Sequence, residues 1–442
     1  MLRYPYLKLS FITFNRLASF RLLSSEGCCQ VQRQKPATLA DERPDLDFDY
    51  LLDPNNLQEI EQNIKNRKGI GNIKKIHELW SSIESFKHDN DQTSQNFSMN
   101  TYEDLWKDLY DEALLIPNKS DPAVPIGDES QAKIVTENPG PEMKIEKPKT
   151  AEDIVKGWRA IRYPRRPAGS RSYALIGPAA NLQTALFSFA KDSVLQKGFE
   201  EIEVSDILPK KITQGCGVNS RNDVSHAIQY DVTDFPKMCL SGTAEMGIAD
   251  KLANRTFKES ELPKLFVAES RCFRPEISKS ASEAKLYRVH EFNKLEMFAV
   301  CTPAQSSKIL QMFLEIQIEI WSKLGVKYRV LDMPSEELGA AASRKYDIEA
   351  WMPGRGIYGE VSSTSNCTDY QARRLGIKYQ KEGNSGEECF GHTCNGTAMA
   401  STRALITVLE TFQTSGGFVP PEILKQYLPK DRHRDKLKMA PA

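Results

Sequence analysis

The sequence lacks the usual signatures of a metal site, a disulfide framework or a phosphate-binding loop. Its nine cysteines form no Cys-x-x-Cys pair and no regular array with its six histidines. An odd, scattered set of cysteines favours buried thiols in a reducing compartment over disulfides or structural zinc. No Gly-rich loop follows a strand-like segment, which argues against P-loop and dinucleotide-binding proteins.

Net charge and long apolar runs are also absent. The chain carries 59 basic and 59 acidic side chains, so attraction to a polyanion must come from local basic patches and not from the whole surface. No apolar run reaches the roughly 18 residues that a membrane span needs, and we expect no membrane partner. With 40% hydrophobic residues, the chain is typical of a globular protein with one large core.

The N-terminus is basic and free of acidic residues. Arg3, Lys8, Arg16 and Arg21 are separated by apolar residues within the first 25 positions. A basic, acid-free amphipathic start is typical of a peptide that targets a protein to the mitochondrial matrix. We therefore predict a targeting peptide over residues 1–26 and a mature protein in the matrix.

Residues 27–116 are expected to form a linker and a short helical hairpin. Apolar residues recur at helical spacing from Leu57 to Ile83, weakened in the middle by Gly69 and Gly71, and again from Tyr102 to Ala113. The segment 87–100 is almost entirely polar and predicts a loop between the two helices. Residues 117–150, rich in Pro and charged residues, predict an irregular connection.

Residues 151–428 predict an α+β domain with a largely antiparallel sheet, because helices and strands follow each other without regular βαβ alternation. Residues 429–442 form a basic tail. The expected helices cover 182–195 and 304–324, the second stopped by Gly325, and the expected strands cover 265–268, 286–298 and 328–331.

The start of this domain is strongly basic. Residues 154–171 contain no acid, and Trp158 and Tyr163 lie among the basic side chains. Such a stretch can bind phosphates and stack on unpaired RNA bases; the alternative is an ordinary solvated face. The candidate RNA-binding residues are Lys156, Arg159, Arg162, Arg165 and Arg166, with Arg171 closing the stretch.

One cluster of charged residues lies on two predicted strands joined by a loop. These strands would bring Arg274, Glu276, Arg288 and Glu296 into one patch. Interleaved Arg and Glu side chains can hold a phosphate chain and an amine together. A salt-bridged sheet surface is the equally simple alternative.

Two further elements carry hydroxyl-rich runs with single acids. The first is Ser241-Gly-Thr-Ala-Glu245, and the second extends from Gly359 to Arg374 and continues at residues 392–398 into a helix with Arg403. Small hydroxyl side chains beside one acid suit close packing on a polar ligand. The alternative is a Ser/Thr-rich strand and a core helix whose Arg403 points outward.

Together these elements resemble the motifs of the class II aminoacyl-tRNA synthetases in their seryl form. The string Glu-Val-Ser-Ser-x-Ser-Asn-Cys-Thr-Asp-Tyr-Gln-Ala-Arg-Arg, from Glu360, is highly specific, and Thr-Ala-Glu separates seryl enzymes from their class relatives. Within the family, the resemblance is strongest to a group of seryl-tRNA synthetase-like insect mitochondrial proteins regarded as non-aminoacylating. The resemblance implies a class II catalytic domain, an antiparallel sheet flanked by helices, with a short N-terminal helical appendage.

The resemblance also implies a reaction and its residues. Serine attacks the α-phosphate of ATP, and the seryl group then moves to the 3′ end of tRNA-Ser, without a protein nucleophile. By position, Arg274 holds the α-phosphate, Arg403 the γ-phosphate, Glu276 and Phe292 the adenine, with Arg288 beside them. Magnesium, if ATP binds, is assigned to Glu360 and Ser363, and the serine pocket to Thr243, Glu245, Glu296 and Thr397.

The sequence departs from the family pattern in the loop 277–285. The family carries glycines and an Arg-Gly pair there, whereas this loop has no glycine and ends in Ala284-Lys285, with Glu283 beside them. Loss of an Arg–phosphate interaction costs about 1.5–3 kcal/mol. Ser205 stands where the family's dimer motif has proline, and the second helix of the expected hairpin is short.

From these departures the sequence predicts a mitochondrial seryl-tRNA synthetase-like protein that binds tRNA-Ser or another mitochondrial RNA but lacks ligase activity and strong ATP binding. The first alternative is an active mitochondrial serine–tRNA ligase that uses Mg-ATP. The second is a partner-binding protein that dimerises with an authentic mitochondrial seryl-tRNA synthetase. A homodimer or such a heterodimer is expected.

Overall fold

The computed structural model describes residues 43–92, 99–143, 145–163, 171–218, 229–276, 285–383, 386–415 and 417–429, with side chains between 88 and 100 left undescribed. Several expectations therefore lie outside the described residues. They are the targeting peptide, most of the linker, Arg165, Arg166, the loop 277–284 and nearly all of the basic tail. None of the described helices is long and apolar enough to cross a membrane.

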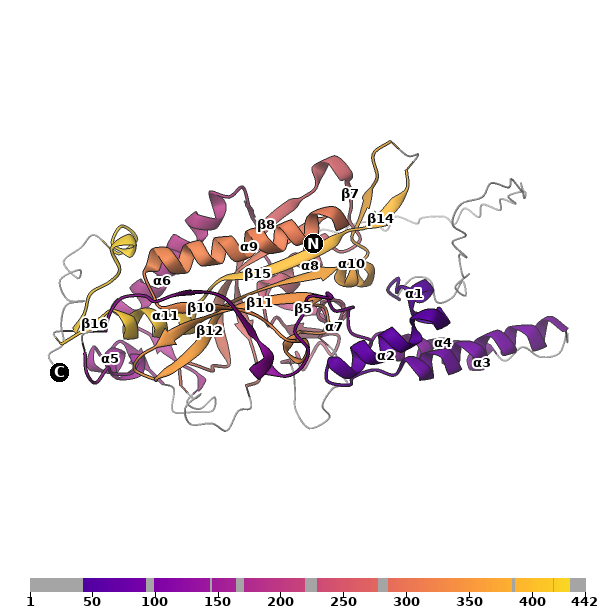
Figure 1. The fold of residues 1–442 in the computed structure, drawn as a ribbon, viewed down its shortest axis with the longest axis horizontal. Coiled ribbons are helices and arrows are strands. Elements are labelled where there is room, and N and C mark those ends of the chain that lie inside the picture. Colours follow the sequence, from indigo (N-terminus) through magenta and orange to yellow (C-terminus); the bar gives the residue numbers. More distant parts are fainter. Residues whose placement is uncertain are drawn as a thin grey trace, which may run out of the picture. The chain divides into compact units, whose positions relative to one another are not determined.

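An eight-stranded sheet forms the centre of the fold, in the order β1-β10-β11-β12-β15-β9-β8-β4 (Figure 1). Every neighbouring pair is antiparallel except β4 and β8. The predicted α+β class with an antiparallel sheet is confirmed. The strands are β1 (Lys133–Asn138), β4 (Glu200–Glu201), β8 (Lys264–Phe273), β9 (Glu291–Cys301), β10 (Tyr328–Asp332), β11 (Arg344–Met352), β12 (Ile357–Thr368) and β15 (His392–Ala400).

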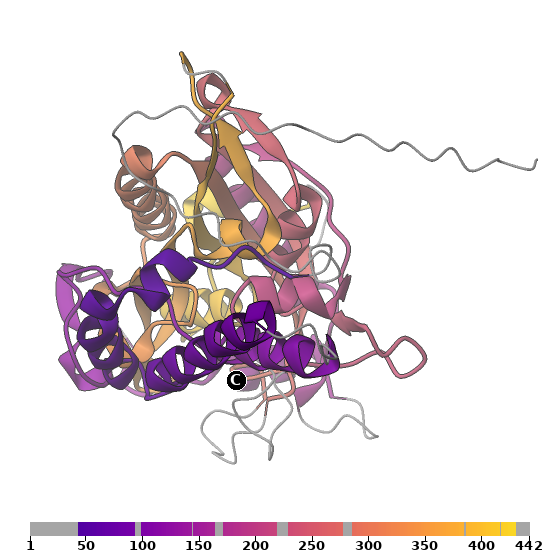
Figure 2. The ribbon, with the colours of Figure 1, turned by 90° about the vertical axis from the view of Figure 1, so that its right-hand side faces the viewer.

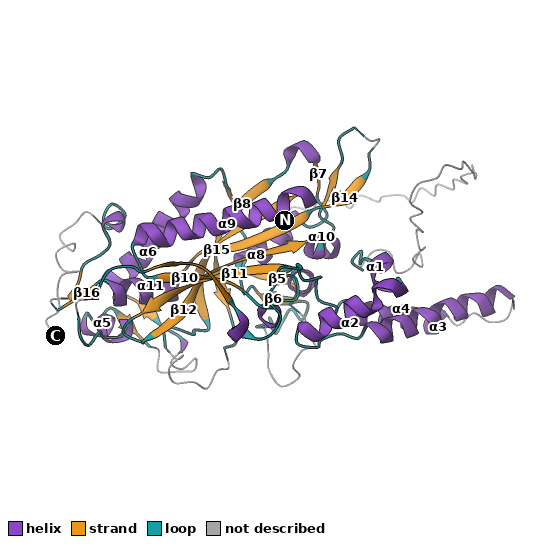
Figure 3. Ribbon diagram, viewed as in Figure 1, coloured by secondary structure: helices purple, strands orange, loops and turns teal. Residues whose placement is uncertain are grey.

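Helices cover the sheet (Figure 3), and apolar side chains of the helices and the sheet are buried between them. On one face, α6 (Pro178–Leu195) and α9 (Pro303–Leu324) contact β9 and β15. The α9 helix buries Phe313 and Ile320, and it ends at Gly325, whose φ of 75° lies in the left-handed region that favours glycine. Residues on α8 (Ala244–Leu252) and α10 (Tyr370–Leu375) pack in a second apolar cluster with Phe298 and Val300.

Short elements complete the domain, and α11 (Ser401–Thr411) contacts β11 and β9. The remaining helices are α5 (Ala151–Gly157) and α7 (Lys210–Gly215). The remaining strands are β2 (Ile161–Arg162), β3 (Ala174–Leu175), β5 (Ile207–Pro209), β6 (Met238–Leu240), β7 (Thr256–Lys258), β13 (Lys378–Gln380), β14 (Glu388–Phe390), β16 (Gln413–Thr414) and β17 (Gly417–Phe418).

The predicted helical hairpin is present; its first helix is longer than expected, and its second is as short as expected, with 15 residues. The pair α3 (Ile73–Gln92) and α4 (Met99–Ala113) lies side by side (Figure 2), and the rings of Trp80 and Trp106 are 5.8 Å apart. Two shorter helices precede it, α1 (Phe48–Leu52) and α2 (Leu57–Asn66). The loop predicted over residues 87–100 is wrong at residues 87–92 and 99–100, which are helical, because polar residues also suit a solvated helix surface.

Two further expectations need correction. The connection 117–150 is not irregular throughout, because β1 pairs with β10 at the edge of the sheet. The strand predicted at 286–298 begins only at Glu291 and continues to Cys301. Leu286 and Val289 are buried within the turn before it, so the apolar run that suggested a strand is explained by packing of the turn.

Candidate functional site

Every pocket residue proposed from the sequence lines one cavity of about 230 Å³. Strands β9, β12 and β15, the segment that follows β8, the turn before β9 and the first turns of α8 and α11 supply its walls. The sequence-proposed lining residues are Thr243, Glu245, Arg274, Glu276, Arg288, Phe292, Glu296, Glu360, Ser363, Thr397 and Arg403. Segments that are far apart in the chain therefore meet at one polar site.

One end of the cavity offers an aromatic face beside guanidinium groups. The guanidinium of Arg274 lies 5.2 Å from the centre of the Phe292 ring and donates weakly, at 3.4 Å, to the carbonyl of Gly242. Arg288 and Glu276 form an ion pair of 3.6 Å next to them. A planar base can stack on the ring while its phosphate meets Arg274, so this end suits a nucleotide.

Arg403 points into the cavity, so the alternative in which it faces outward is wrong. Its Nη1 donates to the carbonyl of Glu360 at 2.8 Å and lies 3.3 Å from the carboxylate of the same residue. The Tyr287 ring lies under Arg403 at 4.7 Å and under Arg355 at 5.4 Å. Arg403 is thereby fixed beside β12 with part of its guanidinium facing the cavity.

Glu360 remains ionised in this setting. Enclosure by the pocket walls favours its neutral form, but Arg403, then Lys345, Arg274 and Lys294, outweigh that effect and lower the pKa of Glu360 to about 2. Protein-bound Mg²⁺ is commonly held by one or two carboxylates together with substrate phosphates. An ionised Glu360 and the hydroxyl of Ser363, both lining the cavity, fit such an ion.

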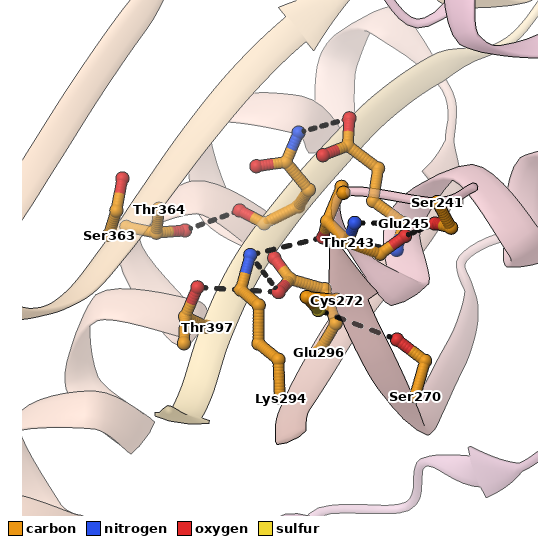
Figure 4. A network of polar contacts seen from close by, with 12 residues as sticks. Ser241, Thr243, Glu245, Ser270, Cys272, Lys294, Glu296, Ser363, Thr364 and Thr397 are labelled. Carbon is orange, nitrogen blue, oxygen red and sulfur yellow. Dashed lines mark hydrogen bonds and ion pairs between the residues drawn. The ribbon is translucent and has the colours of Figure 1, made fainter. Parts of the chain in front are cut away.

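The other end of the cavity is built on a buried ion pair (Figure 4). The Lys294 ammonium lies 2.5 Å from the Glu296 carboxylate and donates to the Thr243 hydroxyl at 3.0 Å. The Thr397 hydroxyl donates to Glu296 at 3.3 Å. Because Lys294 and Glu296 are both buried, their pairing offsets the cost of removing each charge from water.

Glu245 is the second carboxylate at this end, and two amides hold it. Gln371 and Asn395 donate to its Oε1 at 2.6 and 2.9 Å. Burial raises the pKa of Glu245 to about 7, and the Glu296 carboxylate adds to this rise, while Gln371, Lys294 and Asn395 oppose it. An incoming ammonium would be attracted to Glu245 and would favour its ionised form.

Sequence reasoning assigned no role to Lys294, Tyr287, Gln371 or Asn395. The available signal for Lys294 was the alternation of side chains along a strand. Phe292, Lys294 and Glu296 are two residues apart and therefore lie on the same side of the strand. Gln371 and Asn395 stood in the quoted motifs, but their shared partner Glu245 is 126 and 150 residues away. Such a distant pairing is visible only in the folded chain.

The basic stretch is only partly available to RNA. Lys156, Arg159 and Arg162 are exposed, as the phosphate-binding prediction requires. Trp158 instead packs against Phe418, with ring centres 5.8 Å apart, and the hydroxyl of Tyr163 is buried. The core thus covers part of the Trp158 ring, while the Tyr163 side chain is half-buried, and stacking of these two rings on RNA bases stays a prediction.

Comparison with known proteins relates this site to one family. The model of the tRNA synthetase class II core domain (G, H, P, S and T) matches residues 230–412, a range that contains every cavity residue named above. The chain is 43% identical over 336 residues to the mitochondrial serine–tRNA ligase of Mus musculus, covering 74% of this chain and 64% of the mouse protein. The chain thus spans less than two thirds of that relative.

A bacterial relative and a solved structure extend the similarity. The serine–tRNA ligase of Rubrobacter xylanophilus is 40% identical over 329 residues, which cover 73% of this chain and 76% of the relative. The crystal structure of seryl-tRNA synthetase from Pyrococcus horikoshii complexed with ATP superimposes with a TM-score of 0.75 and 26% identity. That match covers 87% of this chain and 100% of the other.

Proposed function

The chain belongs to the seryl-tRNA synthetase family, and from this premise we propose that it is a working mitochondrial serine–tRNA ligase. The observation that carries the proposal is the cavity, in which guanidinium groups and an aromatic ring at one end face two carboxylates at the other. A nucleotide and a small amino acid could lie end to end in it. This favours the active alternative over the loss of activity expected from the loop.

In the first step, a carboxylate oxygen of serine attacks the α-phosphorus of ATP. A phosphorus–oxygen bond to serine forms, and the bond to pyrophosphate breaks. Arg274 would stabilise the charge that develops on the α-phosphate, while Arg403 would hold the distal phosphates. Glu245 would bind the ammonium of serine, and the Thr243 and Thr397 hydroxyls would orient its side chain. Alignment and charge stabilisation supply the catalysis.

Magnesium, when bound, would neutralise charge on the leaving pyrophosphate. Glu360 and Ser363 are the residues placed to hold it, and the low pKa of Glu360 keeps its carboxylate available. Arg403 lies beside the same carboxylate, so its side chain would contact both the residue that holds the metal and the distal phosphates.

In the second step, a hydroxyl of the terminal tRNA ribose attacks the carbonyl carbon of the seryl group, and AMP leaves. A further cavity of about 430 Å³ adjoins the first and shares Thr243, Arg274 and Glu276 with it. Because the two cavities share these residues, the 3′ end of tRNA would reach the reacting carbonyl through the second cavity. The exposed Lys156, Arg159 and Arg162 would bind tRNA phosphates.

The competing function is a tRNA-binding protein that does not charge tRNA. Its support is Ala284-Lys285 in place of the family's Arg-Gly. Lys285 has a φ of 63°, a conformation that glycine adopts more readily than lysine. We propose that this loop weakens ATP binding without abolishing the reaction.

We also propose that the protein acts as a dimer in the mitochondrial matrix. Ser205 is exposed after α6, and Ile207, two residues on, exposes 51% of its surface, as a partner-binding segment would. The partner would be a second copy or an authentic mitochondrial seryl-tRNA synthetase. Light scattering that gives a clean monomer at micromolar concentration, with no partner recovered from mitochondria, would contradict the proposed dimer.

A C-terminally tagged chain that remained in the cytosol would contradict the proposed location in the mitochondrial matrix.

Purified protein assayed with serine, ATP and mitochondrial tRNA-Ser tests the proposed activity. Serine-dependent exchange of pyrophosphate into ATP reports the first step, and acid-stable seryl-tRNA reports both steps. The variant Arg274→Ala should lose exchange, with its melting temperature as the control for folding. tRNA retention in a gel shift without exchange or charging would establish the competing function. If the protein neither retains tRNA nor charges it, the remaining function is that of a partner-binding protein.

A further inference from the structure

Asn118 contacts the end of α2 and the end of β12, outside the catalytic cavity, and uses all of its polar groups. Its backbone N–H donates to the carbonyl of Ala340 at 2.8 Å. Its side-chain amide donates to the carbonyls of Ala341 and Cys367, both at 2.8 Å, and to the Thr368 hydroxyl at 2.9 Å. Its own carbonyl accepts from Arg67 at 3.0 Å. One residue thus joins the end of α2 to the end of β12.

The end of β12 is irregular at the point that Asn118 holds. Asn366 pairs with Cys394 and Thr368 with Thr393, so Cys367 is the extra residue of a β-bulge. Thr368 has a φ of 45°, which a β-branched residue rarely adopts and which surrounding contacts must maintain. The Asn118 amide supplies two of those contacts, to Cys367 and to Thr368.

The bulge in turn lies next to both groups that hold Glu245, Asn395 on β15 and Gln371 on α10. The Cys367 sulfur lies 3.5 Å from the Asn395 amide, which donates to Glu245. The chain after Thr368 turns into α10, whose Gln371 donates to the same Glu245 oxygen. Both amides that fix this carboxylate therefore depend on the backbone path that Asn118 secures.

We propose that Asn118 is a positioning residue for the serine end of the cavity, acting through the bulge at Cys367. The proposal rests on the proposed function, in which Glu245 binds the serine ammonium. Without the Asn118 side chain, the bulge loses the hydrogen bonds to Cys367 and Thr368 that keep Thr368 in its left-handed conformation. Asn395 and Gln371 would then present Glu245 poorly. The nucleotide end, built on Arg274, Phe292 and Arg403, would be unaffected.

The test compares Asn118→Ala with Asn63→Ala in pyrophosphate exchange. Asn63 contacts the same loop, donating to the carbonyl of Asn118 and accepting from Ser120, and neither of these hydrogen bonds reaches the bulge. We expect Asn118→Ala to raise KM for serine about tenfold or more, with KM for ATP within twofold of wild type. Asn63→Ala should change neither value more than twofold. Equal serine KM values for wild type and Asn118→Ala, or equal effects of the two variants, would overturn the proposal.

A second variant covers the case in which Asn118→Ala does not fold. Thr368→Val keeps the β-branched side chain that disfavours the left-handed backbone but removes the hydroxyl that Asn118 contacts, and it should raise KM for serine several-fold. Should wild type show no exchange, the proposed function fails while the inference stays testable by calorimetry. A non-hydrolysable seryl-adenylate analogue should bind Asn118→Ala at least tenfold more weakly than wild type, and AMP should bind both equally. Unchanged affinity for the analogue would refute the positioning role.

Discussion

Lys294 and Glu296 neutralise each other at a distance of 2.5 Å on the floor of the cavity. Of the two carboxylates at that end, Glu296 already has a cation, whereas Glu245 is held only by the amides of Gln371 and Asn395 among the residues that the structure describes. Under the proposed function, the serine ammonium would therefore meet the charge of Glu245. Two acids that looked equivalent in the sequence have different partners in the fold.

Serine binding should depend on pH through Glu245. Its pKa is raised to about 7, so the carboxyl of the empty pocket gains a proton as pH falls below 7 and loses its attraction for the serine ammonium. KM for serine should then rise with falling pH, by at most about tenfold per unit. Pyrophosphate exchange between pH 5.5 and 8.5 measures it. Glu245→Gln should give a high KM without the pH slope; a wild-type KM that is flat below pH 7 would exclude this role.

Arg67 should be a strong determinant of stability. It is 4% exposed and donates to the carbonyls of Asn118, Gly339 and Ala342, and among the described residues it has no ion-pair partner. Arg67→Met leaves these carbonyls without their donor, and each buried acceptor left without a hydrogen bond costs about 1–3 kcal/mol. The substitution should therefore lower the free energy of unfolding by about 3 kcal/mol.

Urea unfolding measures this change, and the neighbouring Lys68→Met is the matched control. Lys68 is exposed and pairs with Glu337 only at 3.8 Å, so its replacement should cost less than about 0.5 kcal/mol. Similar decreases for both variants would show that the hydrogen bonds of Arg67 contribute little.

Repair of the 277–285 loop should strengthen ATP binding. The double variant Ala284→Arg, Lys285→Gly returns the family's pair, and glycine suits the φ of 63° at position 285. One restored Arg–phosphate interaction predicts an affinity for Mg-ATP higher by one to two decades, from about 1.5–3 kcal/mol. Calorimetry with Mg-ATP tests it, with Lys285→Gly alone as the control. Low-micromolar binding by wild type would show that the loop was never impaired.

Affinity for tRNA should fall steeply with salt, because the basic side chains that meet its phosphates are local. Neutral replacement of Arg159, Arg162, Arg165 and Arg166 should weaken retention in a gel shift and reduce the salt slope by about 0.7–0.9 for each phosphate that is no longer neutralised. Neutral replacement of the exposed Lys251, Arg255 and Lys258 is the control. Equal retention by wild type and the four-residue variant would place the RNA-binding surface elsewhere.

The sequence predicted the cavity residues well because specific motifs identify them one by one. The α9 helix was equally predictable from the sequence, since Phe313 and Ile320 repeat at helical spacing and Gly325 ends it. What the sequence missed depends on pairing across the fold. Trp158 was grouped with its basic neighbours, although Phe418, far along the chain, covers it. A role for Asn118 is visible only in the fold, where it forms a hydrogen bond with Thr368, 250 residues away.

The position of β1 determines how much of the chain a folded catalytic unit requires. Strand β1 pairs along β10, whose Tyr328, Val330 and Leu331 are buried. A protein shortened to begin at residue 151, where the sequence suggests that the catalytic domain starts, would keep every cavity side chain but leave one side of β10 open. Open strand edges invite pairing between molecules. The smallest well-behaved catalytic fragment must therefore begin upstream of Lys133, within the segment that composition alone marked as a mere connection.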